Sequence, residues 1–303
     1  MWRNLLFIIH CSLFISVSTY ADDVEMHFDL DPIGQEADGG LVLRLPGMLN
    51  GRRMTYMLDT GASANVISPD YAVSLGLRPL VDSVTVEGVG SAIGQMVIAD
   101  SIELGNLILR QVPFCVVDVS TGRPEYDRYL RHLRAILGRP LLEELGKTTI
   151  DFEHHQLTAP RKPKKKQKRT RRSNLAVVDN VLLLTVNDSL RLIPDFGATH
   201  STLHESDITF SSQGETTEGG GSLSFQGENL RVDTVHYAGV GGVVTVIEYT
   251  LHDFPVRIDK KTFHLPSITV SSSASYESRL GMDFFTRQRR VVFDLRRWRL
   301  TVK

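Results

Sequence analysis

The chain has 303 residues, 34 Lys and Arg against 35 Asp and Glu, 42% hydrophobic residues and two cysteines. This composition excludes a disulfide-stapled miniprotein, a collagen-like chain, a disordered chain and a multi-span membrane protein. The length allows one large domain or two modest ones, each able to bury its own core.

The chain begins with a segment typical of a cleaved secretory leader. Arg3 supplies one positive charge, Leu5 to Val17 form an apolar stretch, and Ala21 precedes two aspartates. The apolar stretch is shorter than the about 20 residues that a membrane-spanning helix needs. We therefore predict a signal peptide over residues 1–21, export to the periplasm or the medium, and no stable membrane span after cleavage. The alternative is an uncleaved anchor.

The first half alternates like β-strands, with few and short helices. The β-rich stretches are 41–45, 84–86, 96–98 and 114–117. Ser68 and Pro69 predict the start of a short helix, because proline is favoured at a first helical position. Cys115 would be the single cysteine of the mature chain, which excludes an internal disulfide, and its apolar neighbours predict a buried thiol.

An apolar strand then runs into Asp59-Thr60-Gly61-Ala62-Ser63. Glycine permits a tight turn that places main-chain N–H groups behind the carboxylate. The hydroxyl of Ser63, four residues after Asp59, is placed to hydrogen-bond the outer oxygen of the carboxylate.

A run from Arg161 to Arg172 holds nine positive charges and no acid. Such a run resists folding and predicts a solvated linker over residues 161–173. A proteolytic processing site, or a patch that adheres to acidic surfaces or nucleic acid, is the alternative. Without Arg3 and this run, 24 Lys and Arg remain against 35 acids, so the rest of the mature chain is acidic.

The two halves that this linker separates are related in sequence. The block from Gly138 to Thr158 aligns without a gap with the block from Gly281 to Thr301, and Asp151 then matches Asp294. Ordered matches over roughly a hundred residues per unit indicate a duplicated domain and not a solenoid, whose units are about 20 to 50 residues long. We interpret the duplicated acids as structural.

The second half repeats the aspartate motif at the corresponding place. Leu190 to Pro194 lead into Asp195-Phe196-Gly197-Ala198-Thr199, so Asp195 matches Asp59 and Thr199 matches Ser63. Each half also carries a glycine-containing turn. These turns are Gly88-Val89-Gly90 and Gly239-Val240-Gly241.

The sequence resembles the retropepsin-like aspartic proteases, and its tandem arrangement is similar to bacterial aspartyl protease-like proteins with two such units in one chain. The resemblance rests on Asp-Thr-Gly-Ala-Ser, on the glycine-containing turns and on the later hydrophobic-Gly block. It implies a mainly β protein of two closed acid-protease lobes, related by a pseudo-twofold axis, with few short helices. The implied lobes are residues 22–160 and 174–303.

The resemblance also implies the site. Asp59 and Asp195 are the expected catalytic pair, supported by Thr60, Gly61, Ser63, Gly197 and Thr199. The two glycine-containing turns are candidate flap tips that close over a substrate, the alternative being ordinary hairpin turns. Phe196 departs from the family, which has Thr or Ser there; that hydroxyl braces the opposite lobe, and phenylalanine can replace it only by packing.

The expected activity is peptide-bond hydrolysis on peptides or unfolded proteins, by a water activated between two aspartates. No metal and no organic cofactor are expected, because the histidines lack the spacing of a metal site. No nucleic acid is expected as a partner apart from the possibility that the basic run raises, and we expect a monomer. The alternatives are an impaired, protease-like module that binds peptide or protein, and a homodimer that uses Asp59 from two chains.

Overall fold

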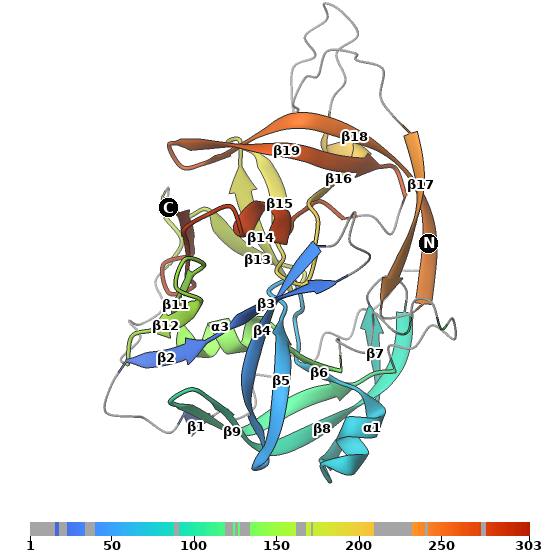
Figure 1. Ribbon diagram of the computed structural model, residues 1–303, viewed down its shortest axis with the longest axis vertical. Coiled ribbons are helices and arrows are strands. Elements are labelled where there is room, and N and C mark those ends of the chain that lie inside the picture. The colour runs from blue at the N-terminus through green and yellow to red at the C-terminus, as the bar shows by residue number, and fades with distance from the viewer. Residues whose placement is uncertain are drawn as a thin grey trace, which may run out of the picture.

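The structure is a computed structural model. It describes residues 16–17, 23–33, 40–87, 91–118, 124, 127, 134–161, 168–170, 172–208, 232–239, 242–273 and 277–303. The chain is mainly β, and its strands form two large sheets, one from each half, and a smaller third sheet (Figure 1). The predicted fold class is confirmed.

The first half builds a nine-stranded sheet, in the lower part of Figure 1. Its main path runs β1-β9-β6-β10-β5-β4-β8-β7, and β3 pairs with β4. The strands are β1 (Ser16–Val17), β3 (Asp29–Ile33), β4 (Gly40–Leu49), β5 (Arg52–Leu58), β6 (Val66–Ile67), β7 (Arg78–Glu87), β8 (Ser91–Leu104), β9 (Leu107–Val116) and β10 (Ala135–Leu137). Helix α1 (Pro69–Ser74) begins at the predicted proline, and α3 (Arg139–Leu145) follows β10.

The second half builds an eight-stranded sheet in the upper part of Figure 1. Its order is β13-β14-β15-β20-β16-β19-β18-β17. The strands are β13 (Leu175–Val178), β14 (Val181–Val186), β15 (Leu190–Pro194), β16 (Thr202–His204), β17 (Val232–Gly239), β18 (Gly242–Ile258), β19 (Lys261–Ser271) and β20 (Arg279–Leu280). A 3₁₀ turn, η2 (Glu205–Asp207), and helix α4 (Met282–Phe285) complete the described part of this half.

The two halves share a third sheet of five strands, in the order β2-β12-β11-β21-β22. Its strands are β2 (Val24–His27), β11 (Lys147–Asp151), β12 (Gln156–Ala159), β21 (Arg290–Asp294) and β22 (Arg299–Val302). The sheet of the first half closes on itself, because β8 pairs with both β4 and β9, and the last strands of each half lie in this common sheet. The domain boundaries at residues 160 and 174 remain predictions.

The register of this shared sheet contains a local twofold symmetry. Lys147 pairs with Asp294, Thr149 with Val292 and Asp151 with Arg290. The duplicated blocks are offset by 143 residues. Lys147 therefore corresponds to Arg290, the partner of Asp151, and Asp151 corresponds to Asp294, the partner of Lys147. A pseudo-twofold axis therefore passes through the pair of Thr149 and Val292.

The same strand arrangement positions both aspartates. In the first half β10 runs parallel to β5 and antiparallel to β6, and in the second half β20 runs parallel to β15 and antiparallel to β16. The N–H of Asp59 donates to the carbonyl of Leu137 at 3.0 Å, and the N–H of Asp195 donates to that of Leu280 at 2.9 Å. Each aspartate thus begins a loop at the carboxyl end of a central strand.

Alternating burial explains why these segments are strands. In β14, every second side chain is buried and the others are partly exposed, the pattern of a strand with one face on a core. Buried side chains of both halves form one continuous hydrophobic cluster. The two lobes therefore share one hydrophobic core.

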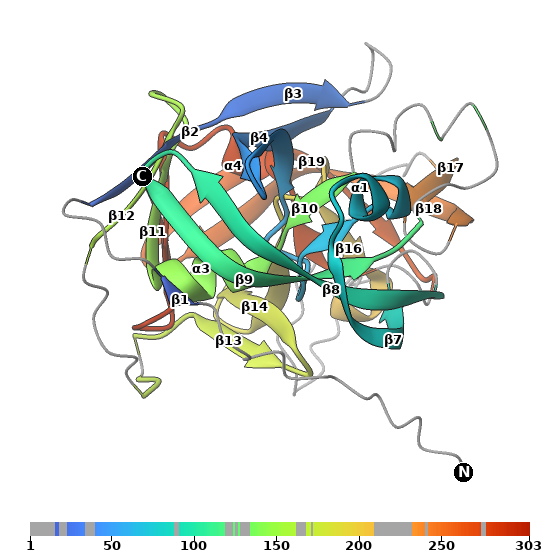
Figure 2. The same ribbon diagram turned by 90° about the horizontal axis from the view of Figure 1, so that it is seen from below.

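Two views place the shared sheet and the long hairpins at opposite ends of the molecule. β2, β11 and β12 lie at the left of Figures 1 and 2, and the ends of β7 and β17 lie at the right. Among the described residues, no helix has both the length and the apolar character to cross a membrane. Strand β1 falls inside the predicted leader and pairs with β9.

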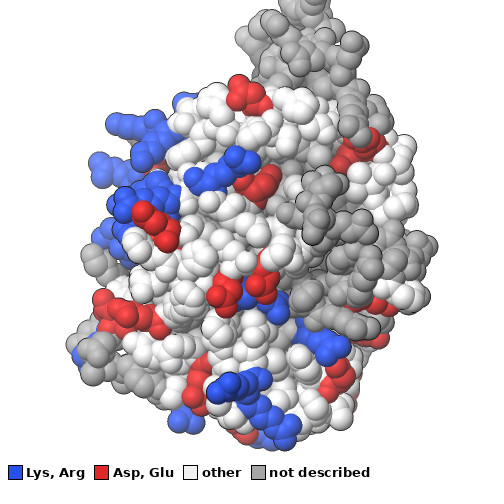
Figure 3. Space-filling view, in the orientation of Figure 1, with Lys and Arg blue, Asp and Glu red and all other residues white. Residues whose placement is uncertain are grey.

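Charges of both signs lie on the face that Figure 3 shows. Lys and Arg gather at its upper left, near the turn between β18 and β19. Arg257 there pairs with Asp188, and Arg299 pairs with Asp259 at 2.7 Å. The described flanks of the basic run, 168–170 and Arg172, are exposed, and residues 162–167 and 171 lie outside the described part.

An ion pair across the shared sheet gives the first prediction. The carboxylate of Asp151 is 9% exposed and accepts bonds from Arg290 at 2.5 and 3.1 Å. Burial acts to raise the pKa of Asp151, but hydrogen bonds from Arg290 and His154 prevail and lower it to about 2. Asp151→Asn should lower the free energy of unfolding at pH 7 by about 2 kcal/mol, because Arg290 loses a charged acceptor.

The effect should depend on pH, and urea unfolding at pH 7 and pH 3 tests this. The lowered pKa means that the carboxylate contributes its full stability above about pH 4, the unfolded value, and loses it as the pH falls toward 2. The gap between wild type and variant should therefore be smaller at pH 3. Asp294→Asn is the matched control, because its pair with Arg297 is longer, at 3.9 Å; a larger loss in the control would contradict the assignment.

Candidate functional site

The first aspartate is held by the turn that follows it. Oδ1 of Asp59 accepts the N–H groups of Gly61 and Ala62, both at 2.9 Å. The backbone thus places two donors behind one oxygen of a half-buried carboxylate, as the glycine after Thr60 predicts. The other oxygen of the carboxylate is left to contacts outside this turn.

The second aspartate repeats this geometry. Oδ1 of Asp195 accepts the N–H groups of Gly197 at 2.8 Å and Ala198 at 3.2 Å. The loop is closed in the same way in both halves, because Arg139 donates its N–H to the carbonyl of Ala62 and Met282 donates to that of Ala198, both at 2.8 Å. Two sequence-distant motifs therefore form the same local structure.

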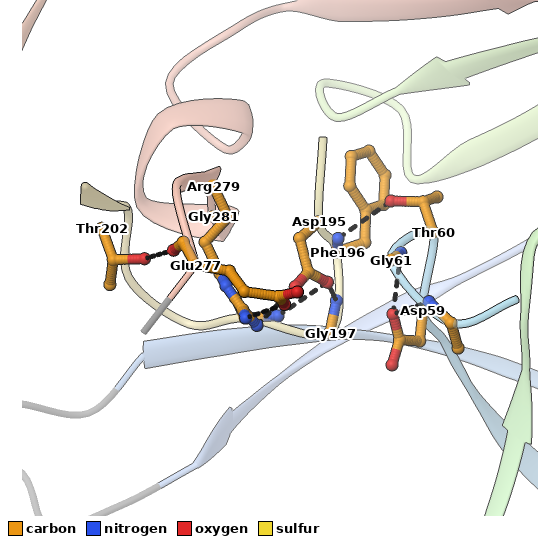
Figure 4. A network of polar contacts seen from close by, with 12 residues as sticks. Asp59, Thr60, Gly61, Asp195, Phe196, Gly197, Thr202, Glu277, Arg279 and Gly281 are labelled. Atoms are coloured by element: carbon orange, nitrogen blue, oxygen red, sulfur yellow. Dashed lines mark hydrogen bonds and ion pairs between the residues drawn. The ribbon is translucent and has the colours of Figure 1, made fainter. Parts of the chain in front are cut away.

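The two loops meet face to face. A Cβ added to Gly61 would lie 2.7 Å from Cγ of Asp195, and a Cβ added to Gly197 would lie 2.4 Å from Cγ of Asp59. Each glycine is thus the surface against which the opposite carboxyl packs, and no larger residue fits at either position without a shift. The structure brings Asp59 and Asp195 together within one chain (Figure 4).

Thr60 braces the two loops from one side. Its hydroxyl accepts the N–H of Phe196 at 3.0 Å and donates to the carbonyl of Pro194. Thr60 is 1% exposed, so both bonds are buried. Phe196 has no hydroxyl to return the brace, and the hydrogen bonding is therefore one-sided, as the sequence predicts.

Phe196 replaces its half of the brace by packing. It is fully buried, and its ring centroid lies 4.8 Å from Phe285, 5.6 Å from Phe293 and 6.0 Å from Phe152. Phe152 belongs to the first half, so this aromatic cluster also joins the lobes. Aromatic pairs at these separations contribute beyond their buried area.

The hydroxyls of Ser63 and Thr199 do not support the carboxylates as predicted. Ser63 is exposed and makes no hydrogen bond to Asp59 among the described residues. The Thr199 hydroxyl bonds Nδ1 of His200 at 2.9 Å, and its side chain lies against Gly40, where an added Cβ would come within 2.0 Å. The Thr199 side chain thus packs against the first half, and its hydroxyl bonds His200 and not Asp195.

Arg279, which was not predicted from the sequence, contacts the oxygen of Asp195 that Thr199 was expected to bond. Nη1 of Arg279 donates to Oδ2 of Asp195 at 3.0 Å, and Nη2 donates to Oε2 of Glu277 at 2.8 Å. Figure 4 shows the guanidinium and Asp59 on opposite sides of the Asp195 carboxyl. A signal was present, because the offset of 143 residues aligns Arg279 with Ile136, and a charge replaces an apolar residue beside the motif.

The electrostatics of the site are those of two like charges brought together. Burial raises the pKa of Asp59, and the charge and hydrogen bond of Asp195 raise it further. Two smaller effects oppose this rise, the hydrogen bond from Ala62 and the positive charge of Arg279. The charged form of Asp59 is therefore disfavoured in this site.

The predicted flap tips lie at the ends of two long hairpins. β7 and β8 pair as far as Glu87 and Ser91, and β17 and β18 pair as far as Gly239 and Gly242. Residues 88–90 and 240–241, which hold most of the predicted tips, lie outside the described residues. Both the flap and the simple-turn interpretation therefore remain predictions.

Other clustered acids of the described residues have structural contacts. One described group of possible metal ligands, Asp151 with Glu153 and His154, lies on the shared sheet, and there Arg290 already occupies the Asp151 carboxylate. The Asp283 carboxylate accepts the Ser201 hydroxyl at 2.7 Å, and burial raises its pKa. Cys115 is a buried thiol, as predicted.

Comparison with known proteins gives the following similarities. A family model described as aspartyl protease matches residues 45–141, which include Asp59 but not Asp195. A retropepsin-like aspartic protease from Rickettsia conorii shares 19% identity over 48% of this chain and 93% of its own, with a TM-score of 0.30. Basic 7S globulin from soybean shares 10% identity over 92% of this chain and 95% of its own, with a TM-score of 0.45. No curated protein sequence matches the chain significantly.

The aromatic cluster predicts a large stability loss on truncation. Phe196→Ala should lower the free energy of unfolding by about 3–5 kcal/mol, because it leaves a cavity between the lobes. Phe196→Leu, which keeps most of the volume, should cost less. Chemical denaturation measures both, with Phe263→Ala at a half-buried ring as control; equal losses for Phe196→Ala and Phe263→Ala would count against the interlobe role.

The one-sided brace predicts a separate loss. Thr60→Val keeps the shape of the side chain but leaves a buried N–H and a buried carbonyl without a partner, so it should cost about 1–3 kcal/mol. Thr60→Ser retains the hydroxyl and should recover most of that stability. Urea unfolding of the two variants tests this, and a Ser variant no more stable than the Val variant would rule out the hydrogen bonds as the cause.

Proposed function

We propose that this chain, of which residues 45–141 match a family model described as aspartyl protease, is an aspartic endopeptidase whose dyad is Asp59 and Asp195. The observation that carries the proposal is the close approach of the two motifs. Each carboxyl lies against the glycine of the opposite loop, and each is held by two N–H groups of its own turn.

The geometry is suited to acid–base hydrolysis. Two carboxyls this close cannot both ionise easily, so the pair holds one proton over a range of pH. The ionised carboxylate takes a proton from a water, whose oxygen forms a bond to the scissile carbonyl carbon while the protonated carboxyl donates to the carbonyl oxygen. Collapse of this tetrahedral species breaks the C–N bond, and a proton passes to the leaving nitrogen. Peptides or unfolded proteins are the proposed substrates.

The dyad is proposed to be intramolecular. In a homodimer that uses Asp59 twice, a second copy of the first loop would have to lie where Gly197 and Asp195 lie against Asp59. Thr60 and the shared sheet already join the first half to the second. A monomer that carries both aspartates is therefore the favoured form.

Export is part of the same proposal and rests on the leader sequence. Residues 1–21 have the charged, apolar and small-residue order of a signal peptide. The periplasm or the medium is the proposed location, with the basic run as a solvated linker between the lobes.

A second candidate function is a protease-like module that binds peptide or protein without cutting it. Two observations favour it, and both lie on the second motif. Phe196 removes one hydroxyl of the brace, and Arg279 occupies an oxygen of Asp195. Either change can weaken catalysis while leaving the lobes and their hairpins in place.

Digestion of a peptide library across acidic to neutral pH tests the proposal. Wild type should cleave, and Asp59→Asn and Asp195→Asn should each reduce kcat/KM by at least about a thousandfold, because each removes one proton carrier of a coupled pair. Asp151→Asn, at the buried aspartate outside the site, is the control and should retain activity.

The pattern of loss separates the alternatives. Loss with Asp59→Asn alone would favour the homodimer. An inactive wild type that still binds peptides would favour the binding module and overturn the endopeptidase.

A further inference from the structure

We propose that Arg279 is a positioning residue that fixes Asp195 as the ionised member of the pair and leaves the proton on Asp59. The resulting catalytic roles rest on the proposed function, whereas the charge on Asp195 does not. Asp195 would be the base that accepts the proton of the attacking water, and the Asp59 O–H would be the acid that donates to the carbonyl oxygen.

The first support is the built contact between the two side chains. Nη1 of Arg279 lies 3.0 Å from Oδ2 of Asp195, whose side chain is 7% exposed. β20 holds the arginine beside the strand that leads to the aspartate, with Arg279 opposite Ile193. Glu277, at 2.8 Å from Nη2, holds the other side of the guanidinium. The arginine is thus fixed from two sides.

The second support is the asymmetry of the two motifs. The position that matches Arg279 in the first half is Ile136, which packs in an apolar cluster with Met57 and Cys115. Asp59 has no Lys or Arg within ion-pair distance among the described residues. Asp195 therefore accepts three donors, two N–H groups and a guanidinium, and Asp59 accepts two N–H groups.

This asymmetry decides where the proton lies. A cation at hydrogen-bond distance stabilises the charged form of a carboxyl, typically by one to three pKa units. The charges that face Asp195 are Asp59 on the opposite lobe and Arg279 on β20, with Glu277 behind the arginine. Once Asp195 is negative, a second charge on Asp59 is disfavoured, so Asp59 keeps the proton.

With Asp195 ionised and Asp59 protonated, the donor and the acceptor of each proton transfer are defined. Water loses a proton to Asp195 as its oxygen bonds the carbonyl carbon, and Asp59 gives its proton to the carbonyl oxygen. On collapse, the proton on Asp195 moves to the leaving nitrogen and Asp59 recovers its own. Arg279 takes part in none of these transfers, and its effect passes through Asp195.

Carbon-detected NMR titration of the full chain, labelled with ¹³C at the aspartate carboxyls, tests the proposal without requiring activity. Asp195→Asn and Asp59→Asn assign the two signals. In wild type, Asp195 should ionise at a lower pH than Asp59. Arg279→Met should raise the ionisation midpoint of Asp195 by about one to three pH units, and Arg279→Lys should recover most of that shift.

Arg290→Met is the matched control, because it removes an arginine from a buried aspartate outside the site. It should move the Asp151 signal and leave Asp195 unchanged. An Asp195 that ionises after Asp59 in wild type, or whose midpoint stays in place in Arg279→Met, would overturn the proposal. If Arg279→Met does not fold, the wild-type order and the Arg279→Lys titration still decide it.

The pH profile of kcat/KM then tests the catalytic roles. Its acidic limb should move upward in Arg279→Met by the same amount as the Asp195 midpoint and stay in place in Arg290→Met. A wild type that cuts no peptide would defeat the proposed function, yet the titration would still decide the charge on Asp195. An active wild type whose acidic limb ignores Arg279 would overturn the assignment of the base.

Discussion

The structure depends on the close approach of two carboxyls that repel each other when both are charged. Asp59 and Asp195 are each set on a glycine of the opposite loop, so neither can be moved without the other. The rest of the interface offsets this cost. Thr60 ties the loops by hydrogen bonds, the aromatic cluster around Phe196 packs behind them, and the shared sheet holds the ends of both halves. The site is therefore a property of the interface and of neither lobe alone.

The duplication explains how much of the two-lobed fold and of the aspartate pair could be predicted from the sequence. The matching aspartates, the glycines two residues later and the aligned terminal blocks predict two related β lobes with one aspartate each. Those features are local, since a tight turn after an apolar strand leaves few conformations. The one-sided brace followed from Thr60 and Phe196 in the same way, because one side chain has a hydroxyl and the other does not.

The parts that sequence could not predict depend on packing between the halves. Ser63 and Thr199 were expected to hydrogen-bond the carboxylates, but Thr199 packs against Gly40 of the other half and bonds His200. Arg279 reaches Asp195 because β20 pairs with β15, a contact between segments more than eighty residues apart. The terminal strands were assigned to separate lobes, but the shared sheet uses the same alternating pattern, which does not identify its partner strand. The only sign of the contact between Arg279 and Asp195 in the sequence was the charge of Arg279 at the position that corresponds to Ile136.

The shared sheet has a consequence for the predicted basic linker. β11 and β12 precede the linker and β21 and β22 come from the end of the chain, so the strands that hold the halves together lie on both sides of it. A single cut between residues 161 and 173 would yield two polypeptides that remain one particle, joined by backbone hydrogen bonds, by the buried pair of Asp151 and Arg290 and by a continuous core. Nicking and dissociation are separate events in this architecture, and a two-chain form would keep both aspartates facing each other.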